Sequence, residues 1–371
     1  MNDIDELKQF VEIHARSQNI PTARYREIVA NVTHDRGDTE GSWVRAWSDA
    51  ARELEAQGRP LDACRHYNMA RFPFVDGPAR QHALDRCVAA FDLWRRTQGD
   101  IEPLLVESPD GPLRCWTANL SSTGARPILL VTGGIVSVKE QWAPVLAQAK
   151  RLGMAGVVTE MPGVGENGLR YDADSWRMFP AVLDAVARHA PVESVYTVAL
   201  SFSGHLALRA ATHDDRIKGV ITAGAPIEHF FSDAEWRRQV PRVTRDTLAH
   251  LARVAPDEVG AHMSEWGLGK DELAALDIPV AYMTSLRDEI IPPGDAEAIR
   301  EHVRRLTLIG NDDVHGSPDH VVETRLWILL NLLRMSGRRG PQRAVLGTLW
   351  RVARTRNRFK KQGRVAERVN G

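Results

Sequence analysis

Two patterns of hydrophobic and polar positions divide the chain. In residues 1–97, apolar positions recur every three or four residues, as in the face formed by Leu7, Phe10 and His14. This spacing places side chains on one side of an α-helix, so the region predicts an N-terminal helical domain. From residue 98 onward, short runs rich in Val, Ile and Leu alternate with helical stretches.

The alternating region predicts a mostly parallel β-sheet covered by helices on both faces. We expect strands at residues 101–107, 112–119, 127–132, 155–159, 195–200, 218–223, 280–285 and 305–309. Helices are expected at residues 141–152, 175–189, 204–212 and 320–335. The predicted fold class is therefore α/β, with this domain spanning residues 98–336.

An insertion at residues 226–276 contains no strand candidate. At the carboxyl edge of a parallel sheet, such a segment predicts a helical lid over an active site, or helices that simply close the fold. We expect its aromatic side chains Phe230, Trp236 and Trp266 to line a substrate pocket. That pocket would lie between the sheet, the insertion and the N-terminal helices.

The composition of the chain argues against several classes of protein. The chain has 371 residues, 43% of them hydrophobic, with 48 basic and 48 acidic side chains. No window is long and apolar enough to predict a membrane-spanning helix, and the acidic N-terminus does not resemble a signal peptide. Three scattered cysteines predict neither a disulfide framework nor a zinc site. We expect a cytoplasmic protein that uses no metal and no cofactor.

Charge is distributed unevenly along the chain. Residues 337–371 hold eleven Arg and Lys but a single acidic residue, Glu367, so the rest of the chain is acidic. This basic tail predicts a solvated or self-docked extension, which we favour over a nucleic-acid-binding segment. Leu349 and Trp350 predict that part of it docks as a helix. The helical domain and the tail together favour a homodimer.

Ser201 follows the strand predicted at residues 195–200 directly and precedes a helix. A serine at a sharp strand-to-helix turn is the nucleophile of an α/β-hydrolase, and the turn requires small residues two positions before and after it. Here those residues are Ala199 and Ser203, where glycines are usual. Ser203 as the nucleophile would place the larger His205 in the second of these positions. Ser201 is therefore the candidate nucleophile.

The serine requires a general base, and the base requires a carboxylate, in the chain order Ser, acid, His. Asp288 lies just after the strand predicted at residues 280–285 and is the candidate acid, with Glu289 as the alternative. His315 lies in the loop after the last predicted strand and is the candidate base. His320 is its competitor, although we expect it to open the final helix.

An acyl-transfer site also requires backbone N–H groups aimed at the oxygen where negative charge develops. One is expected from Phe202, the residue after the nucleophile. The second is expected from the glycine-containing loop at residues 132–136, at Gly134 or Ile135. The loop lacks the sequence pattern of a phosphate-binding loop.

Three segments, at residues 133–140, 160–166 and 200–205, resemble conserved blocks of one branch of the α/β-hydrolases. The branch includes the fermentation–respiration switch protein, 2,6-dihydropseudooxynicotine hydrolase and fungal polyketide-shortening hydrolases. Its members carry an N-terminal helical domain with a pattern of Trp, Ala, Gly and Tyr similar to that of this chain. The resemblance covers about residues 40–335 and excludes the basic tail.

The resemblance implies cleavage of an ester or a C–C bond next to a carbonyl group, by a Ser/Asp/His triad without a cofactor. The substrate would be a small, polyketide-like or other secondary metabolite. Some similar enzymes, in tetronate antibiotic pathways, eliminate acetate instead, so a lyase is the alternative. Glu140, Glu166 and Tyr171 would line the pocket, unless Glu140 serves as a carboxylate at a helix N-terminus. A non-catalytic binding or regulatory protein is the other class.

Overall fold

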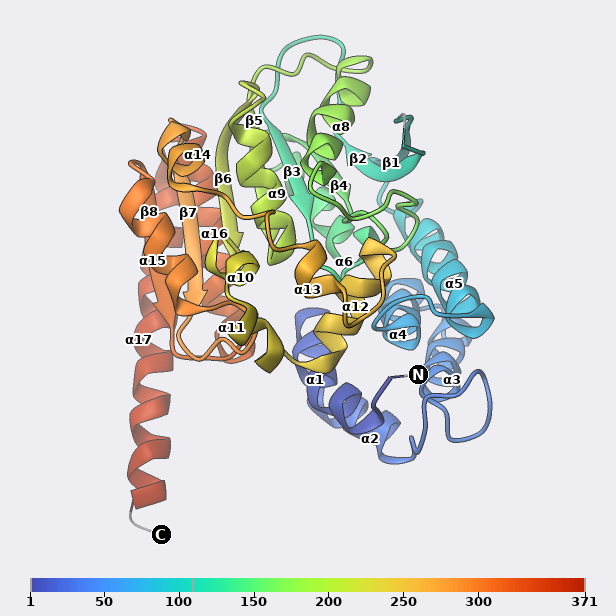
Figure 1. Ribbon diagram of the computed structural model, residues 1–371. Helices are drawn as coiled ribbons and strands as arrows, with labels where there is room; N and C mark the ends of the chain where they lie inside the picture. Colours follow the sequence, from blue (N-terminus) through green and yellow to red (C-terminus); the bar gives the residue numbers. More distant parts are fainter. Residues whose placement is uncertain (1, 109, 370–371) are drawn as a thin grey trace.

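The centre of the molecule is an eight-stranded sheet, in the order β1-β2-β4-β3-β5-β6-β7-β8 (Figure 1). The computed structural model describes residues 2–108 and 110–369, with side chains through residue 357. The strands are β1 (Ile101–Val106), β2 (Leu113–Ala118), β3 (Ile128–Thr132), β4 (Ala155–Thr159), β5 (Val195–Leu200), β6 (Ile217–Ala223), β7 (Val280–Ser285) and β8 (Leu306–Asn311). Strands β3 to β8 run parallel, whereas β1 and β2 pair antiparallel. All the strands expected from the sequence are confirmed; Pro109, in the turn between the first two, lies outside the described residues.

The helices fall into four groups along the chain. The first precedes the sheet and comprises α1 (Ile4–Ser17), α2 (Thr22–Ala30), α3 (Trp43–Ala56), α4 (Pro60–Arg71) and α5 (Pro78–Arg95). The second connects or follows the strands and comprises α6 (Lys139–Trp142), α7 (Leu146–Ala149), α8 (Met178–Ala187), α9 (Phe202–Ala211), α15 (Pro293–His302) and α16 (Val321–Met335). The insertion contains α10 (His229–Ser232), α11 (Ala234–Gln239), α12 (Arg242–Ala252), α13 (Val259–His262) and α14 (Lys270–Ala275). The last is α17 (Pro341–Val369).

Helices cover both faces of the sheet, as the continuous apolar strands require. On β6, Gly219 and Thr222 are three positions apart and therefore face opposite sides. A Cβ atom on Gly204 of α9 would lie 2.0 Å from the Thr222 hydroxyl oxygen, and one on Gly219 would lie 2.9 Å from the sulfur of Met335 on α16. Glycine at these two positions lets one helix approach each face closely.

The helix predicted at residues 141–152 is interrupted. The structure has α6, a 3₁₀ turn at Ala143–Val145 and then α7. Pro144 lies in this turn, where its ring and missing N–H group do not permit a continuous helix. The helix predicted at residues 175–189 likewise begins with a 3₁₀ turn, at Ser175–Arg177.

The N-terminal helices and the insertion meet over the carboxyl edge of the sheet. In Figure 1, α1 and α12 lie side by side below the ends of the parallel strands. A carboxylate oxygen of Glu6 on α1 accepts a hydrogen bond from the backbone N–H of Val243 on α12, at 2.8 Å. Two segments separated by more than two hundred residues thus close the same side of the sheet.

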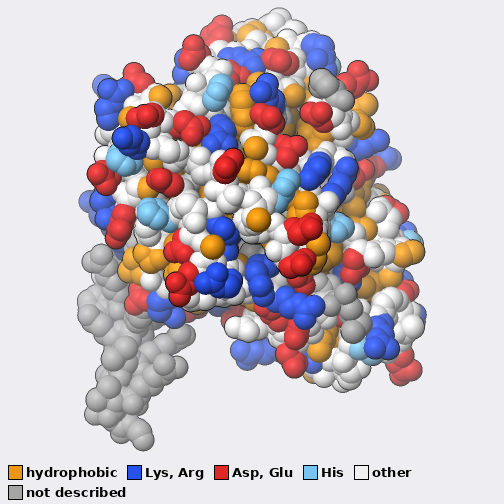
Figure 2. Space-filling model, viewed as in Figure 1, with side chains coloured by type: hydrophobic (Ala, Val, Ile, Leu, Met, Phe, Trp, Pro, Cys, Tyr) orange, Lys and Arg blue, Asp and Glu red, His pale blue; other side chains and the backbone are white. Residues whose placement is uncertain are grey.

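The C-terminal helix α17 packs along α16 and then extends past the body of the molecule (Figure 1). A guanidinium nitrogen of Arg354 lies 2.6 Å from a carboxylate oxygen of buried Glu323 on α16, and Trp350 packs against the core. Part of the basic tail therefore docks on the chain itself, while its side chains from residue 358 onward lie outside those described. The face seen in Figure 2 intermixes acidic and basic side chains. Among the helices described, none has the length and apolarity needed to cross a membrane.

Candidate active site

Ser201 occupies a strained turn between β5 and α9. Its backbone has φ 58° and ψ −134°, a region that a residue with a side chain rarely adopts. The turn is fixed by the Ser201 N–H, which donates to the carbonyl of Ala223 at 2.8 Å. Ser203 fits the place of the usual glycine because its hydroxyl donates to the carbonyl oxygens of Leu200 and Thr132, at 3.0 and 3.2 Å.

Three of the predicted residues form a hydrogen-bonded chain. The Ser201 hydroxyl oxygen lies 3.0 Å from Nε2 of His315, and Nδ1 of the same ring lies 2.9 and 3.0 Å from the two carboxylate oxygens of Asp288. The three residues follow the carboxyl ends of β5, β7 and β8, parallel strands that end at the same edge of the sheet, which explains their convergence. An imidazole held in this way can take a proton from the serine hydroxyl.

Glu289 and His320, the alternatives named from the sequence, are not part of this hydrogen-bonded chain. Glu289 accepts a hydrogen bond from the backbone N–H of His315 at 3.0 Å, so it supports the histidine loop and not the imidazole. His320 pairs with Asp313, with Nδ1 at 2.9 Å from a carboxylate oxygen. The structure therefore brings Asp288 and His315 to the serine.

The carboxylate of Asp288 also sets the basicity of His315. Burial alone would lower the pKa of the imidazole, but the charge of Asp288 and its hydrogen bond outweigh it and raise the pKa above its ordinary value. Asp288 is itself fixed, because one of its oxygens accepts the N–H groups of Ile290 and Ile291, both at 2.9 Å. The imidazole is thus oriented by a carboxylate that the backbone holds in place.

The predicted oxyanion loop lies against the serine. A Cβ atom on Gly134 would be 3.0 Å from Cβ and 3.4 Å from Oγ of Ser201. Phe202 is the first residue of α9, where the backbone N–H has no partner within the helix. Gly134, Ile135 and Phe202 all line the cavity at Ser201. The loop at residues 132–136 and the start of α9 therefore lie beside the Ser201 hydroxyl, as the sequence led us to expect.

A buried arginine that the sequence analysis did not identify supports this loop. The guanidinium of Arg71, on α4, donates to the carbonyl of Val136 and also to Asn68 Oδ1 and the Pro73 carbonyl, at 2.9 and 3.1 Å. Burial lowers the pKa of Arg71 to about 10. The N-terminal helices thus help to position the loop beside Ser201.

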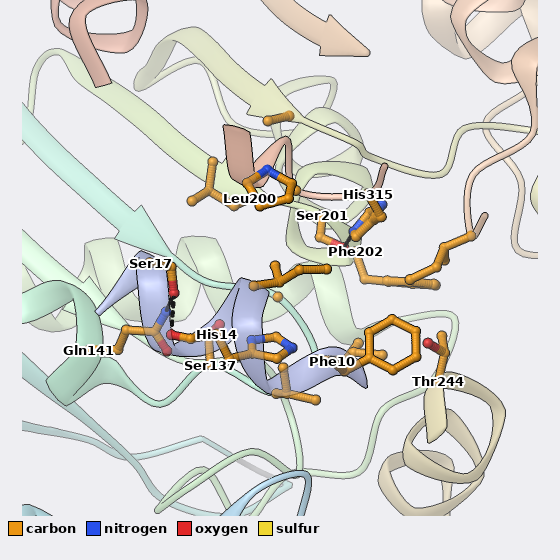
Figure 3. A pocket seen from close by; sticks show the side chains of 18 of the residues that line it. Phe10, His14, Ser17, Ser137, Gln141, Leu200, Ser201, Phe202, Thr244 and His315 are labelled. Atoms are coloured by element: carbon orange, nitrogen blue, oxygen red, sulfur yellow. Dashed lines mark hydrogen bonds between the residues drawn. The ribbon is translucent and has the colours of Figure 1, made fainter. Parts of the chain in front are cut away.

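The cavity at Ser201 has a volume of about 200 Å³ and lies where the sequence predicted it, between the sheet, the insertion and the N-terminal helices (Figure 3). Its walls are mostly apolar. Helix α1 contributes Phe10, His14 and Ser17, and α12 contributes Val243, Thr244 and Thr247. None of these six residues was expected from the sequence to line the pocket, although a histidine on the apolar face of α1, His14, was a signal in the sequence.

The six side chains expected to line the pocket lie elsewhere. Glu140 and Glu166 belong to a buried ionic cluster, in which the ammonium of Lys139 lies 2.9 Å from Glu140, 3.2 Å from Glu160 and 2.7 Å from Glu166. Burial raises the pKa of Glu160 to about 7. The backbone N–H of Lys139 also donates to Glu160 at 2.8 Å. The cluster thus fixes the start of α6, the helix that follows the loop at residues 132–136, and does not contribute to the cavity lining.

The aromatic members of that set fill the core. Tyr171 and Trp266 pack edge to face, with ring centroids 5.2 Å apart, and Phe230 packs on Phe202 at 5.0 Å. The indole N–H of Trp236 donates to the carbonyl of Ile290 at 2.8 Å. Large aromatic rings in a helical insertion are needed for its own packing, which leaves smaller residues of α12 to face the cavity.

Among the described residues, no group of three or more His, Cys, Asp or Glu side chains is arranged to hold a metal ion. The chemistry that the arrangement supports depends on the serine, the imidazole and the backbone N–H groups. These are the groups required for nucleophilic attack on a carbonyl carbon.

The chain is similar in sequence and fold to several known proteins. A solved structure of wild-type AbyA5 is 52% identical, covers 94% of this chain and 99% of its own, and superposes with a TM-score of 0.90. Esterase FrsA of Vibrio vulnificus (strain YJ016) is 22% identical over 305 residues, or 73% of each chain. The 2,6-dihydropseudooxynicotine hydrolase of Paenarthrobacter nicotinovorans is 24% identical over 250 residues, which cover 66% of this chain and 59% of the relative. The family model described as "Esterase FrsA-like" matches residues 31–273, more than half of the chain. The chain therefore belongs to the FrsA-like esterase family and has the α/β-hydrolase fold.

Proposed function

We propose that this protein is a serine-dependent hydrolase acting on a small, largely apolar carbonyl compound, an ester or a 1,3-dicarbonyl compound. The observation that carries the proposal is the hydrogen-bonded chain from Ser201 through His315 to Asp288, at the wall of an apolar cavity. Membership of an esterase family supports it. An apolar cavity with few polar groups favours an acyl part of low polarity.

In the proposed reaction, Ser201 attacks the carbonyl carbon while His315 takes its proton. Asp288 holds the imidazole in the correct tautomer and stabilises its positive charge. The N–H groups of Phe202 and of Gly134 or Ile135 bind the oxyanion. The leaving group then departs with the proton from His315, and a water molecule, activated by the same imidazole, releases the acyl group.

A lyase is the second candidate, and one observation favours it: His315 lines the cavity itself, so its Nε2 atom can reach a substrate C–H group directly. The imidazole would take a proton next to a carbonyl group, the oxyanion site would hold the enolate, and an acyloxy group would leave from the β-position. This reaction consumes no water and forms a C=C bond. An acetylated tetronate-type secondary metabolite is the substrate class that this alternative implies.

Labelled water distinguishes the two reactions. The enzyme is incubated in ¹⁸O water with a β-acetoxy ketone, and the released acetate is analysed by mass spectrometry. Hydrolysis introduces one ¹⁸O atom into acetate and leaves an alcohol, whereas elimination releases acetate with its original oxygens and an alkene. The proposal predicts labelled acetate that disappears with Ser201→Ala. Unlabelled acetate and an alkene would establish the lyase, and no turnover of this compound, of simple esters or of 1,3-diketones would contradict both.

A further inference from the structure

His14 reaches from the N-terminal helices into the cavity at Ser201. It lies on α1 one turn after Phe10 and one turn before Ser17, so the three side chains share a face of the helix. All three line the cavity that Ser201 and His315 also line. In Figure 3, His14 occupies the wall opposite Ser201 and His315.

The imidazole of His14 has a packing partner but no hydrogen-bond partner. Its ring packs on Phe72, with centroids 4.6 Å apart and planes inclined by 44°. The backbone carbonyl of His14 accepts from the Ser17 hydroxyl at 2.8 Å, whereas neither ring nitrogen is paired within the described part of the chain. The other cavity imidazole, His315, is bonded through both nitrogens. An unpaired ring in a mostly apolar cavity indicates a place for a polar ligand atom.

Two neighbouring polar side chains of this wall, Ser17 and Thr247, already make hydrogen bonds. Ser17 accepts a hydrogen bond from the Gln141 amide at 3.2 Å, and the Thr247 hydroxyl donates to the Val243 carbonyl at 2.6 Å. Their capacity to bind a substrate atom is reduced accordingly. His14 thus retains both a donor and an acceptor on this side of the cavity.

The charge state of His14 defines what it can do. Burial, reinforced by the positive charges of Arg71 and His315, lowers the pKa of His14 to about 3. The ring is therefore neutral near neutral pH, and it is too weakly basic to take a proton from a hydroxyl or from carbon. A neutral imidazole can still donate one hydrogen bond to a carbonyl oxygen and polarise it.

We propose that His14 is a specificity-determining residue that donates a hydrogen bond to a second oxygen atom of the substrate, separate from the oxygen at the carbon attacked by Ser201. The backbone N–H groups serve the reacting oxygen on one wall, and His14 faces the substrate from the other. The inference rests on the proposed function, since it concerns the same cavity. It specifies the substrate class further: a carbonyl compound with a second carbonyl oxygen in its acyl part.

The proposed hydrogen bond from His14 is tested by ligand binding to the Ser201→Ala variant, in which Ser201 cannot attack the ligand. In Ser201→Ala, the affinities of phenyl 3-oxobutanoate and phenyl butanoate are measured by calorimetry; the two esters differ only by one carbonyl oxygen. We expect the oxo ester to bind about tenfold more tightly, the usual effect of one hydrogen bond in a cavity. Adding His14→Phe keeps a flat ring beside Phe72 but should bring the ratio of the two affinities close to one. Adding His82→Phe, at an exposed position on α5, should leave the ratio unchanged.

The preference for the oxo ester separates a binding role from a structural one. A purely structural role of His14 would weaken both esters together in His14→Phe and keep their ratio. That result, or the absence of a preference before the change, would overturn the inference. Because no turnover is required, this outcome is independent of whether Ser201 proves to be a nucleophile in the wild type.

Discussion

The imidazole of His315 lies directly over Gly224. A Cβ atom on residue 224 would come within 2.8 Å of Cε1 and 3.2 Å of Nδ1 of that ring, and Gly224 has φ +62°. The residue after β6 must therefore lack a side chain for His315 to meet both Asp288 and Ser201.

This contact predicts that Gly224→Ala impairs the site more than it destabilises the fold. Gly337→Ala is the matched control, because Gly337 has φ +69° but no atom within 4 Å of an added Cβ. Each change should cost about 1 kcal/mol of unfolding free energy through backbone strain. Only Gly224→Ala should slow the labelling of Ser201 by a fluorophosphonate, by about a hundredfold. Equal labelling rates in the two variants would show that the His315 position does not depend on Gly224.

Replacing Asp288 should change both the rate and its pH dependence. In the wild type, the rate of labelling should rise with pH through the pKa of His315, which lies above the ordinary histidine value, because only the neutral imidazole accepts the serine proton. Asp288→Asn removes the negative charge that raises the pKa of His315, whereas burial still lowers it. The midpoint of the pH profile of the labelling rate therefore moves to lower pH. The rate itself should fall about a thousandfold or more.

Glu289→Gln is the control for that change. Glu289 contacts the backbone of His315 and acts on the ring only through its charge, so a smaller shift of the midpoint in the same direction is expected. The two shifts are compared by measuring the rate of fluorophosphonate labelling of each variant between pH 5 and 9. A shift in Glu289→Gln as large as that in Asp288→Asn would argue against Asp288 as the orienting carboxylate.

Lys139 should be essential for stability, since its ammonium is surrounded by Glu140, Glu160 and Glu166. Lys139→Met leaves buried carboxylates without a cation, which should cost about 3–5 kcal/mol in urea unfolding at pH 8. Lys150→Met, at an exposed position, should cost less than about 0.5 kcal/mol.

The cost of Lys139→Met should also depend on pH. Without the ammonium, the pKa of the buried Glu160 rises above its present value of about 7, whereas in the unfolded chain it returns to an ordinary glutamate value. The folded state then binds protons that the unfolded state does not, so stability falls as the pH rises between those two values. The loss should be smaller at pH 5 than at pH 8; a pH-independent loss would indicate that packing, not charge, dominates.

Much of the site was predictable from the sequence because it depends on local geometry. The turn at Ser201 requires small neighbours, and Asp288 and His315 each follow a strand that ends at the same edge of the sheet. Parallel topology brings such positions together without detailed knowledge of packing.

The cavity wall was less predictable, because it depends on which face of each helix meets which neighbour. Phe230 and Trp266 were expected in the pocket but are used as core residues, while Val243 and Thr244 of the same insertion face the cavity. His14 lies on an apolar helix face, a pattern that predicts core as readily as a cavity. The missing hydrogen-bond partner of its ring, which is seen only in three dimensions, indicates that His14 is a cavity residue and not a core residue.

The proposed activation of the Ser201 hydroxyl is tested by the intact mass of the protein after exposure to a fluorophosphonate. We expect a single adduct on the wild type, none on Ser201→Ala, and undiminished labelling in Ser232→Ala, which removes an exposed hydroxyl that does not line the cavity. A folded wild-type protein that forms no adduct, or forms one that persists in Ser201→Ala, would contradict it.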